Sequence, residues 1–161
     1  MIRKHKAFSW PRKLYDKTRI IEENKLVEKY GLRNKREIWR SEAQVRYYRT
    51  RAKTLINASQ EEQIVFFSKL NAIGLQVSSI ADVLALTKEN ILKRRLSTIL
   101  VARGFAATAR QARQMITHRR VRIGARVVGS PSYIPAVDEE SIISVKASRV
   151  PTITKTGGVA A

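Results

Sequence analysis

The sequence of 161 residues has no cysteine, only two histidines and no long hydrophobic run. Without cysteine, the chain cannot form a disulfide, a thiolate nucleophile or a cysteine-bound zinc site. A membrane-spanning helix needs about 18 consecutive apolar residues, and no stretch approaches that length. The basic N-terminal segment also lacks the apolar core of a secretory signal peptide. These absences predict a cytoplasmic protein that has no membrane partner.

Acidic residues are also scarce, because 13 of them stand against 32 lysines and arginines, which gives a net charge of +19. Residues 1–55 hold 17 basic and 6 acidic side chains, and residues 90–137 hold 10 basic and no acidic ones. The segment between these blocks is nearly neutral. A folded chain with so much charge of one sign is expected to work beside a polyanion. Nucleic acid is the first candidate and the partner that we predict, and an anionic membrane surface is the second candidate.

Groups of residues that would support catalysis or metal binding are missing. His5 and His118 have no carboxylate cluster or cysteine beside them in the sequence, so each is expected to be solvated or to contact phosphate. Asp138, Glu139 and Glu140 are adjacent near a predicted turn, and we interpret them as a solvated loop. The sequence therefore predicts no enzyme activity, no metal, no cofactor and no small-molecule substrate.

The first two thirds of the chain read as helices that follow a basic arm over residues 1–13. Apolar periodicity predicts helices over about 14–30, 34–55 and 59–73, then a short helix, a break near Thr87 and a longer helix ending at Gly104. Asn34 and Glu37 have the spacing of a capping box, and Ser59 and Glu62 repeat it. In the second helix, a stripe is expected to be buried: Ile38, Val45, Ala52 and Leu55. Five basic residues must then largely face outward: Arg40, Arg46, Arg49, Arg51 and Lys53.

A basic helix and a hairpin are predicted in the acid-free block. Thr108 is a suitable cap for a helix over about 109–117. At 100° per residue its apolar side chains share one face, namely Ala109, Ala112, Met115 and Ile116, and Arg110 and Arg113 lie on the opposite side. "VRIGARVV" then predicts a tight hairpin with Gly124 in its turn, and "SIISV" at 141–145 predicts a further strand. Arginine suits phosphate because its planar guanidinium donates two hydrogen bonds at once.

Two long motifs carry a resemblance to a known family. "RRLSTILVARGFAATARQARQMITHRRVRIGARVVGSPSY" resembles the small RNA-binding motif named after ribosomal protein four of the small subunit. Upstream, "RKLYDKTRIIEENKLVEKYGLRNKREIWR" resembles the N-terminal region of the archaeal and eukaryotic branch of that family. In the motif, Arg119 stands where a glycine is common, and Gly124-Ala125 stands where Asn-Gly is common.

The resemblance implies an α+β fold with four parts: an extended basic arm at 1–13, a mainly helical region at 14–93, an RNA-binding module of two helices, a β-hairpin and a short antiparallel sheet at 94–150, and a tail at 151–161. It also implies a structural protein of the small ribosomal subunit that binds small-subunit rRNA directly near a helix junction, with protein five as a neighbour. Charge and resemblance together give the residues expected to contact RNA: Arg95, Thr108, Arg110, Gln111, Arg113, Gln114, His118, Arg119, Arg120, Arg122 and Arg126 in the module, Arg46, Arg49, Arg51 and Lys53 in the second helix, and Arg12 and Lys13 in the arm.

Other functions stay open at this point. The chain can be a nonribosomal RNA-binding factor or the binding arm of an RNA-modifying enzyme, although its upstream residues are too few for a separate catalytic domain. A DNA-binding protein would need base-reading side chains, for which Gln111 and Gln114 are the candidates. The aromatic residues of the arm region, Phe8, Trp10 and Tyr15, either stack on bases or pack on the helices.

Overall fold

The computed structural model describes residues 7–146, so residues 1–6 and the expected tail at 151–161 lie outside the described part. The elements are α1 (Lys17–Tyr30), α2 (Arg36–Thr54), a 3₁₀ turn (Leu55–Asn57), α3 (Gln60–Ala72), α4 (Ile80–Ala85), α5 (Lys88–Lys93), α6 (Leu96–Ala102), α7 (Ala109–Thr117), β1 (Val121–Ile123), β2 (Arg126–Val127), α8 (Val137–Ser141) and β3 (Ile143–Val145). Helices dominate and the single described sheet is antiparallel. The predicted α+β class is confirmed.

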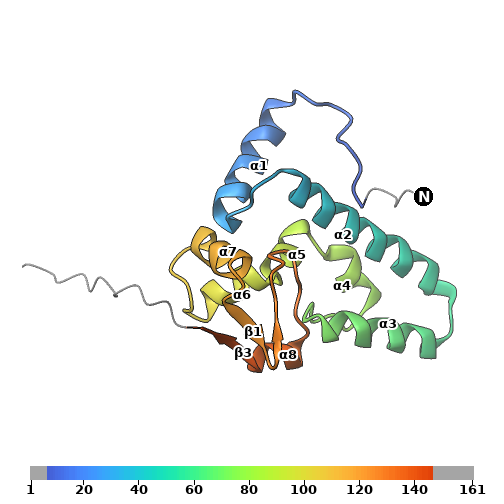
Figure 1. The fold of residues 1–161 in the computed structure, drawn as a ribbon. Helices are drawn as coiled ribbons and strands as arrows, with labels where there is room; N and C mark the ends of the chain where they lie inside the picture. The colour runs from blue at the N-terminus through green and yellow to red at the C-terminus, as the bar shows by residue number, and fades with distance from the viewer. Residues whose placement is uncertain (1–6, 147–161) are drawn as a thin grey trace, which may run out of the picture.

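The long helix α2 runs along one side of the molecule, with α1 at its first end and α3 at its second (Figure 1). The predicted stripe of α2 is confirmed, because Ile38, Val45, Ala52 and Leu55 are all buried. Val45 and Ala52 share a core with Val83, Leu86 and Ile91. Ile38 belongs to a second core, with Leu26 and Tyr30 of α1 and Leu92 of α5. Phe66 and Phe67 of α3 pack against the first core, as a structural role for these rings requires.

Both predicted capping boxes are wrong. The N-cap of α2 is Lys35, which makes no side-chain capping bond, while Asn34 accepts a hydrogen bond from the backbone N–H of Arg36. Glu37 does not reach back to Asn34, because its carboxylate is held by two arginines of the C-terminal region. Ser59 is the N-cap of α3, but its side chain makes no capping bond either.

The longer helix that was expected to end at Gly104 is two helices, α5 and α6. The chain leaves helical geometry at Arg95, whose backbone is extended at φ −72° and ψ 144°. The N–H of Leu96 then donates to the carbonyl of Tyr133 at 2.8 Å instead of to a carbonyl of its own helix. A long-range hydrogen bond therefore separates α5 from α6. Helical periodicity did not predict this break, because it reports only on local spacing.

The C-terminal region packs α6 and α7 on one face of a three-stranded sheet of order β2-β1-β3. The hairpin turn is Gly124-Ala125, and Gly124 has φ 56°, as the turn prediction required. The third strand begins at Ile143 and not at residue 141, because α8 occupies the preceding residues. The expectation of a solvated loop at Asp138–Glu140 is wrong, since this segment is helical.

The end of α1 meets the start of α7, although these helices belong to different parts of the sequence. Gly31 closes α1 with φ 58°, and a Cβ built there would lie 2.8 Å from the carbonyl carbon of Ala109. Only glycine combines that backbone conformation with so close an approach. The contact holds the basic helix α7 against the N-terminal helices (Figure 1).

Candidate nucleic-acid interface

The basic helix α7 begins with a local hydrogen-bond network. The hydroxyl of Thr108 accepts from the N–H of Gln111 at 3.2 Å, which confirms the predicted cap. The side-chain oxygen of Gln111 accepts from the N–H of Ala107 at 3.0 Å. Ala112 and Ile116 are fully buried against α6 and the sheet. Thr108 and Gln111 therefore fix the start of α7, and the NH₂ group of Gln111 makes no hydrogen bond within residues 7–146.

The hairpin places arginines on the side away from the core. Val121 and Ile123 of β1 are buried, and Arg122 between them is exposed, as strand alternation requires. Arg119 and Arg120 lie in the link from α7 to β1 and are also exposed. Arg119 has φ 56°, a left-handed conformation that a residue with a side chain adopts at a cost of about 1–2 kcal/mol. A glycine would adopt that conformation without strain.

Four exposed arginines of this region have no carboxylate within 4.0 Å anywhere in residues 7–146. They are Arg110, Arg119, Arg120 and Arg122. The exposed side chains of Gln114 and His118 lie on the same face of α7 as Arg110. We name these six residues the α7–hairpin surface, within which Arg122 stands on the face of the sheet opposite α7, because Val121 and Ile123 beside it pack toward α7. Its guanidinium groups are available to an anionic partner.

Two other predicted contact residues are turned into the protein. Arg95 is 4% exposed, and its guanidinium donates to Glu37. Arg113 donates to both oxygens of the same carboxylate, at 3.2 and 2.9 Å. Arg95 is therefore buried, and Arg113, which helical periodicity places on the outer face of α7, is only 23% exposed. Contact with RNA stays a prediction for both. Burial alone would raise the pKa of Glu37, but the hydrogen bonds from Arg113 and Arg95 outweigh burial and bring the pKa below its ordinary value.

The acidic residues of α8 hold three more arginines. Glu140 pairs with Arg94 and, at 3.4 Å, with Arg103. The hydroxyl of Tyr133 donates to Glu139 at 2.6 Å, and Arg126 donates to the Tyr133 hydroxyl at 2.7 Å. The hydrogen bond from Tyr133 is the main cause that lowers the pKa of Glu139. The acid-free block is thus partly neutralised by carboxylates that lie outside it in sequence.

The predicted contacts of α2 form a separate group. Arg46, Arg51 and Lys53 are exposed, and Arg49 donates to the carbonyl of Leu86 at 2.7 Å. Lys53 lies 16 residues after Glu37 on α2, which corresponds to about 24 Å along the helix axis. These residues are therefore not brought together with the α7–hairpin surface.

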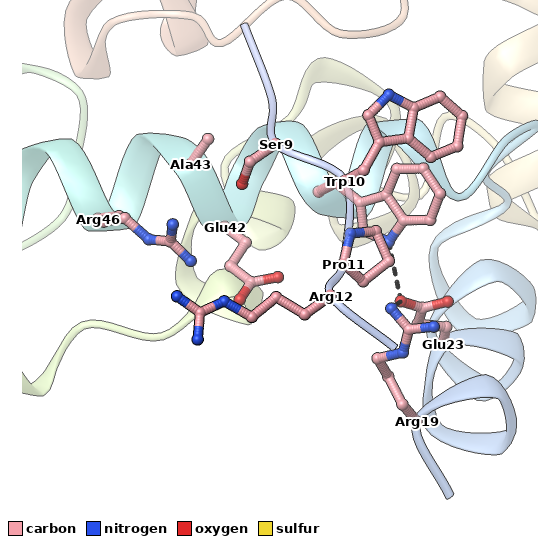
Figure 2. A pocket seen from close by; sticks show the side chains of 10 residues that line it. Ser9, Trp10, Pro11, Arg12, Arg19, Glu23, Glu42, Ala43 and Arg46 are labelled. Atoms are coloured by element: carbon pink, nitrogen blue, oxygen red, sulfur yellow. Dashed lines mark hydrogen bonds and ion pairs between the residues drawn. The ribbon is translucent and has the colours of Figure 1, made fainter. Parts of the chain in front are cut away.

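The arm joins the α2 group and not α7. Arg12 and Arg46 line one cavity of about 430 Å³ between the arm and α2, and Figure 2 shows both side chains near Glu42. Lys13 is exposed. The predicted site is thus divided into two basic surfaces on different elements.

The aromatic residues of the arm region have different environments. Trp10 and Phe8 pack on Trp39 of α2, with ring centroids 5.2 and 6.0 Å from it. The indole N–H of Trp39 donates to the buried carboxylate of Glu23 at 2.8 Å (Figure 2). Tyr15 is 90% exposed and is not part of this cluster. Packing on the helices therefore describes Phe8 and Trp10, while Tyr15 stays a free aromatic.

Within residues 7–146, no helix is long and apolar enough to cross a bilayer. The same residues contain no group of three or more histidine or acidic side chains arranged to hold a metal ion. Arginine, exposed glutamine and histidine are thus the chemistry that the described surfaces offer. These groups suit phosphate and base edges.

Comparison with known proteins identifies the family. Residues 94–141 match the model of the S4 domain, which covers α6, α7, the hairpin and α8. The chain is 44% identical over 148 residues to small ribosomal subunit protein uS4 of Thermoplasma acidophilum, covering 86% of this chain and 74% of that protein. The proteins of the same name from Ignicoccus hospitalis and Hyperthermus butylicus are 41% and 38% identical over 144 residues each, covering 87% and 82% of their length and 86% of this chain. The chain therefore belongs to the family of small ribosomal subunit protein uS4.

Proposed function

We propose that this protein is a structural component of the small ribosomal subunit that binds small-subunit rRNA directly. The observation that carries the proposal is the α7–hairpin surface, where four exposed arginines have no carboxylate partner within residues 7–146. A surface of solvated charge normally mixes both signs. The family membership supports RNA as the polyanion, because the relatives are named as proteins of the small ribosomal subunit.

The mechanism that we propose is electrostatic and geometric. Arg110, Arg119, Arg120 and Arg122 hold phosphates of an RNA helix junction through paired hydrogen bonds. The fixed angle between α7 and the hairpin sets the spacing of those contacts, because both elements share one core. Base edges lie deep in the major groove of A-form RNA, so shape and backbone contacts dominate at such a junction. Gln114, His118 and the free NH₂ group of Gln111 add polar contacts at the same surface.

The roles of the remaining predicted residues follow from their positions. We propose that residues 94–150 act as the RNA-binding module and that residues 14–93 support it and supply the second basic surface. Arg46, Arg51, Lys53, Arg12 and Lys13 contribute phosphate contacts on that second surface. Arg95 and Arg113 act through Glu37 on the position of α7.

Partners and location are part of the same proposal. The protein acts in the cytoplasm within the small subunit, beside rRNA and neighbouring ribosomal proteins, with protein five as the expected neighbour. We propose no catalytic role. A nonribosomal RNA-binding factor is the alternative, and it would carry the same basic surfaces without entering the subunit.

Cosedimentation with small ribosomal subunits tests the proposal and separates it from the alternative. The protein is expected in the small-subunit fraction, and its absence from that fraction in cells that express it would contradict a ribosomal role. Filter binding to small-subunit rRNA at several salt concentrations tests the mechanism. If phosphate contacts dominate, the logarithm of affinity falls with the logarithm of salt at a slope of roughly −0.7 to −0.9 for each neutralised phosphate. We expect a slope that corresponds to at least about six contacts, and an affinity independent of salt would rule out the mechanism.

A further inference from the structure

A groove between the arm and α2 lies apart from the α7–hairpin surface. It is lined by Ala7, Phe8 and Ser9 of the arm and by Arg40, Ala43, Gln44, Arg46, Tyr47 and Thr50 of α2, and its volume is about 780 Å³. On α2, Arg40, Ala43, Gln44 and Tyr47 are spaced as one helix face requires. The groove adjoins the cavity of Figure 2, with which it shares Ser9, Ala43 and Arg46. The arm forms one wall of the groove and α2 forms the other.

The lining combines an exposed aromatic ring with positive charge. Tyr47 is 66% exposed, although Tyr48 beside it is partly buried in the core. Arg40 and Arg46 flank the ring along the helix, and both are exposed. No carboxylate lines this groove, and neither arginine pairs with an acid elsewhere in the described residues. An apolar ligand would leave both guanidinium groups unused, so the lining suits an anion that also carries a flat ring.

We propose that this groove binds an unpaired nucleotide segment of RNA, with a base stacked on Tyr47 and the flanking phosphates held by Arg40 and Arg46. Proteins that bind single strands combine a positive groove along the backbone with aromatic side chains under the bases. A paired base cannot stack on Tyr47, because both of its faces are covered within the duplex. The groove adds a second kind of RNA contact to the phosphate clamp. The groove rests on the proposed function in that RNA is the partner and in that Arg46 also belongs to the second basic surface, while its other residues are different.

The neighbouring tryptophans provide a local signal for this binding. Trp10 and Trp39 are the only two tryptophans of the chain, and both lie within 6.0 Å, centroid to centroid, of Phe8 in the groove wall. A base that enters the groove changes the surroundings of this cluster. Glu37, which faces α7, and Trp39 lie about 160° apart around α2, so RNA bound only at the α7–hairpin surface contacts a different side of this helix. Tryptophan fluorescence therefore distinguishes the two surfaces.

The test titrates the full chain with an oligouridylate of about eight nucleotides, a length within the range of single-strand sites. We expect quenching of tryptophan fluorescence and about 5- to 150-fold weaker binding by Tyr47→Ala, the range that one base stacked on an aromatic ring contributes. Tyr47→Phe keeps the ring and should bind like the parent. Tyr15→Ala is the matched control, because it removes an even more exposed tyrosine that does not line the groove. A thermal melt of each variant checks that the fold is unchanged.

Three outcomes would contradict the proposal that this groove binds unpaired RNA. These are equal binding by Tyr47→Ala and the parent, the absence of any oligouridylate binding, and equal competition by a blunt RNA duplex. An acidic peptide that displaces the oligouridylate and binds more tightly would also overturn it, in favour of a protein ligand. If one of these results is obtained and the protein still cosediments with the small subunit, the proposed function is not contradicted. If the protein is absent from that fraction but its binding of oligouridylate depends on Tyr47, the ribosomal role is contradicted and the groove is still an RNA-binding site.

Discussion

Glu37 of α2 accepts a hydrogen bond from Arg113 of α7 at 2.9 Å, across 76 residues of sequence. The same carboxylate accepts from Arg95, at the residue that precedes α6. One acidic side chain thus connects the N-terminal helices to the start of α6 and to α7 of the S4 domain. Because α7 carries Arg110 and leads directly into the link and hairpin that carry Arg119, Arg120 and Arg122, Glu37 fixes the rotation of the α7–hairpin surface relative to α2. Glu37, a residue with a structural role, therefore determines the geometry of the proposed RNA-binding surface.

Replacement of Glu37 by glutamine should destabilise the fold. Arg95 is almost fully buried, and its Nε already has no hydrogen-bond partner in the described structure. Removing the negative charge would leave a buried guanidinium uncompensated, which typically costs about 3–5 kcal/mol in the free energy of unfolding. We expect a loss of about 3 kcal/mol, because Glu37 itself is partly accessible. Urea unfolding measures it.

Glu42→Gln is the matched control for this experiment. Glu42 lies on the same helix, is exposed, and pairs with no basic group within 4.0 Å in residues 7–146. Its replacement should change the free energy of unfolding by no more than about 0.5 kcal/mol. Equal stability of the two variants would mean that the Glu37 pairs contribute nothing to the fold.

The same carboxylate should make stability depend on pH. The pKa of Glu37 in the folded protein lies below its ordinary value of 4.5. Its stabilising contribution is therefore complete above pH 4.5 and is lost as the pH falls through the folded pKa. The difference in unfolding free energy between the parent and Glu37→Gln should be larger at about pH 6 than at about pH 3. Asp82, whose pKa is lowered to about 2 by hydrogen bonds from Ser78 and Ser79, acts equally in both proteins and cancels in this comparison.

The sequence predicted the local structure of α7 well and its long-range partners poorly. Thr108, Ala112 and Ile116 occupy the predicted cap and core positions, because capping and periodicity act within one helix. Arg113 is about 60° from Arg110 on the helical wheel and about 60° from Ile116, so it lies at the edge of the buried face. Whether the side chain of such a residue faces solvent or the protein depends on the residues of α2 that lie opposite it.

Charge pairing shows the same limit. An acid-free stretch of sequence indicates an acid-free surface only if no carboxylate arrives from another element. Glu37 was explained by a local capping pattern, and Glu140 by a solvated loop, so neither was available as a partner. An arginine at the edge of an apolar helix face is the feature of the sequence that indicates the need for a carboxylate partner. Within residues 7–146, Arg110 and Arg122 are among the arginines that still have no carboxylate partner once Glu37 and Glu140 are placed.

Charge reversal at Arg110 and at Arg113 should therefore have different effects. Arg110→Glu removes an exposed charge without a described partner, so stability should change by no more than about 0.5 kcal/mol. Its binding to small-subunit rRNA should weaken by at least about 10-fold, since a hydrogen bond to a charged group contributes about 1.5–3 kcal/mol. Arg113→Glu places a second carboxylate against Glu37 and should lower the unfolding free energy by about 3 kcal/mol or more.

Filter binding and urea unfolding on both variants separate these roles. Lys69→Glu, which changes an exposed basic residue of α3, is the control for a charge reversal outside the predicted contacts. It should leave both stability and rRNA affinity close to those of the parent. Unchanged rRNA affinity in Arg110→Glu would show that the α7–hairpin surface is not the RNA-binding surface.

Arg119 should be a residue whose removal strengthens the fold and weakens binding. Its backbone has φ 56°, which costs a residue with a Cβ about 1–2 kcal/mol. Arg119→Gly relieves that strain, and the greater freedom of glycine in the unfolded chain offsets part of the gain. We expect a net rise of about 0.5–1 kcal/mol in the free energy of unfolding. Affinity for small-subunit rRNA should fall by about 10-fold or more, because the guanidinium is lost.

Arg120→Gly is the control, because it removes the same charge from the next residue. Arg120 does not have a positive φ, and its carbonyl accepts a hydrogen bond from Lys146 at the edge of the sheet. Glycine there adds unfolded-state freedom without relieving strain, so stability should fall by about 0.5–1 kcal/mol. The two variants should thus lose rRNA affinity alike and change stability in opposite directions, measured by filter binding and urea unfolding. If Arg119→Gly gains stability and keeps its full rRNA affinity, the left-handed arginine is a strained residue without a part in RNA binding.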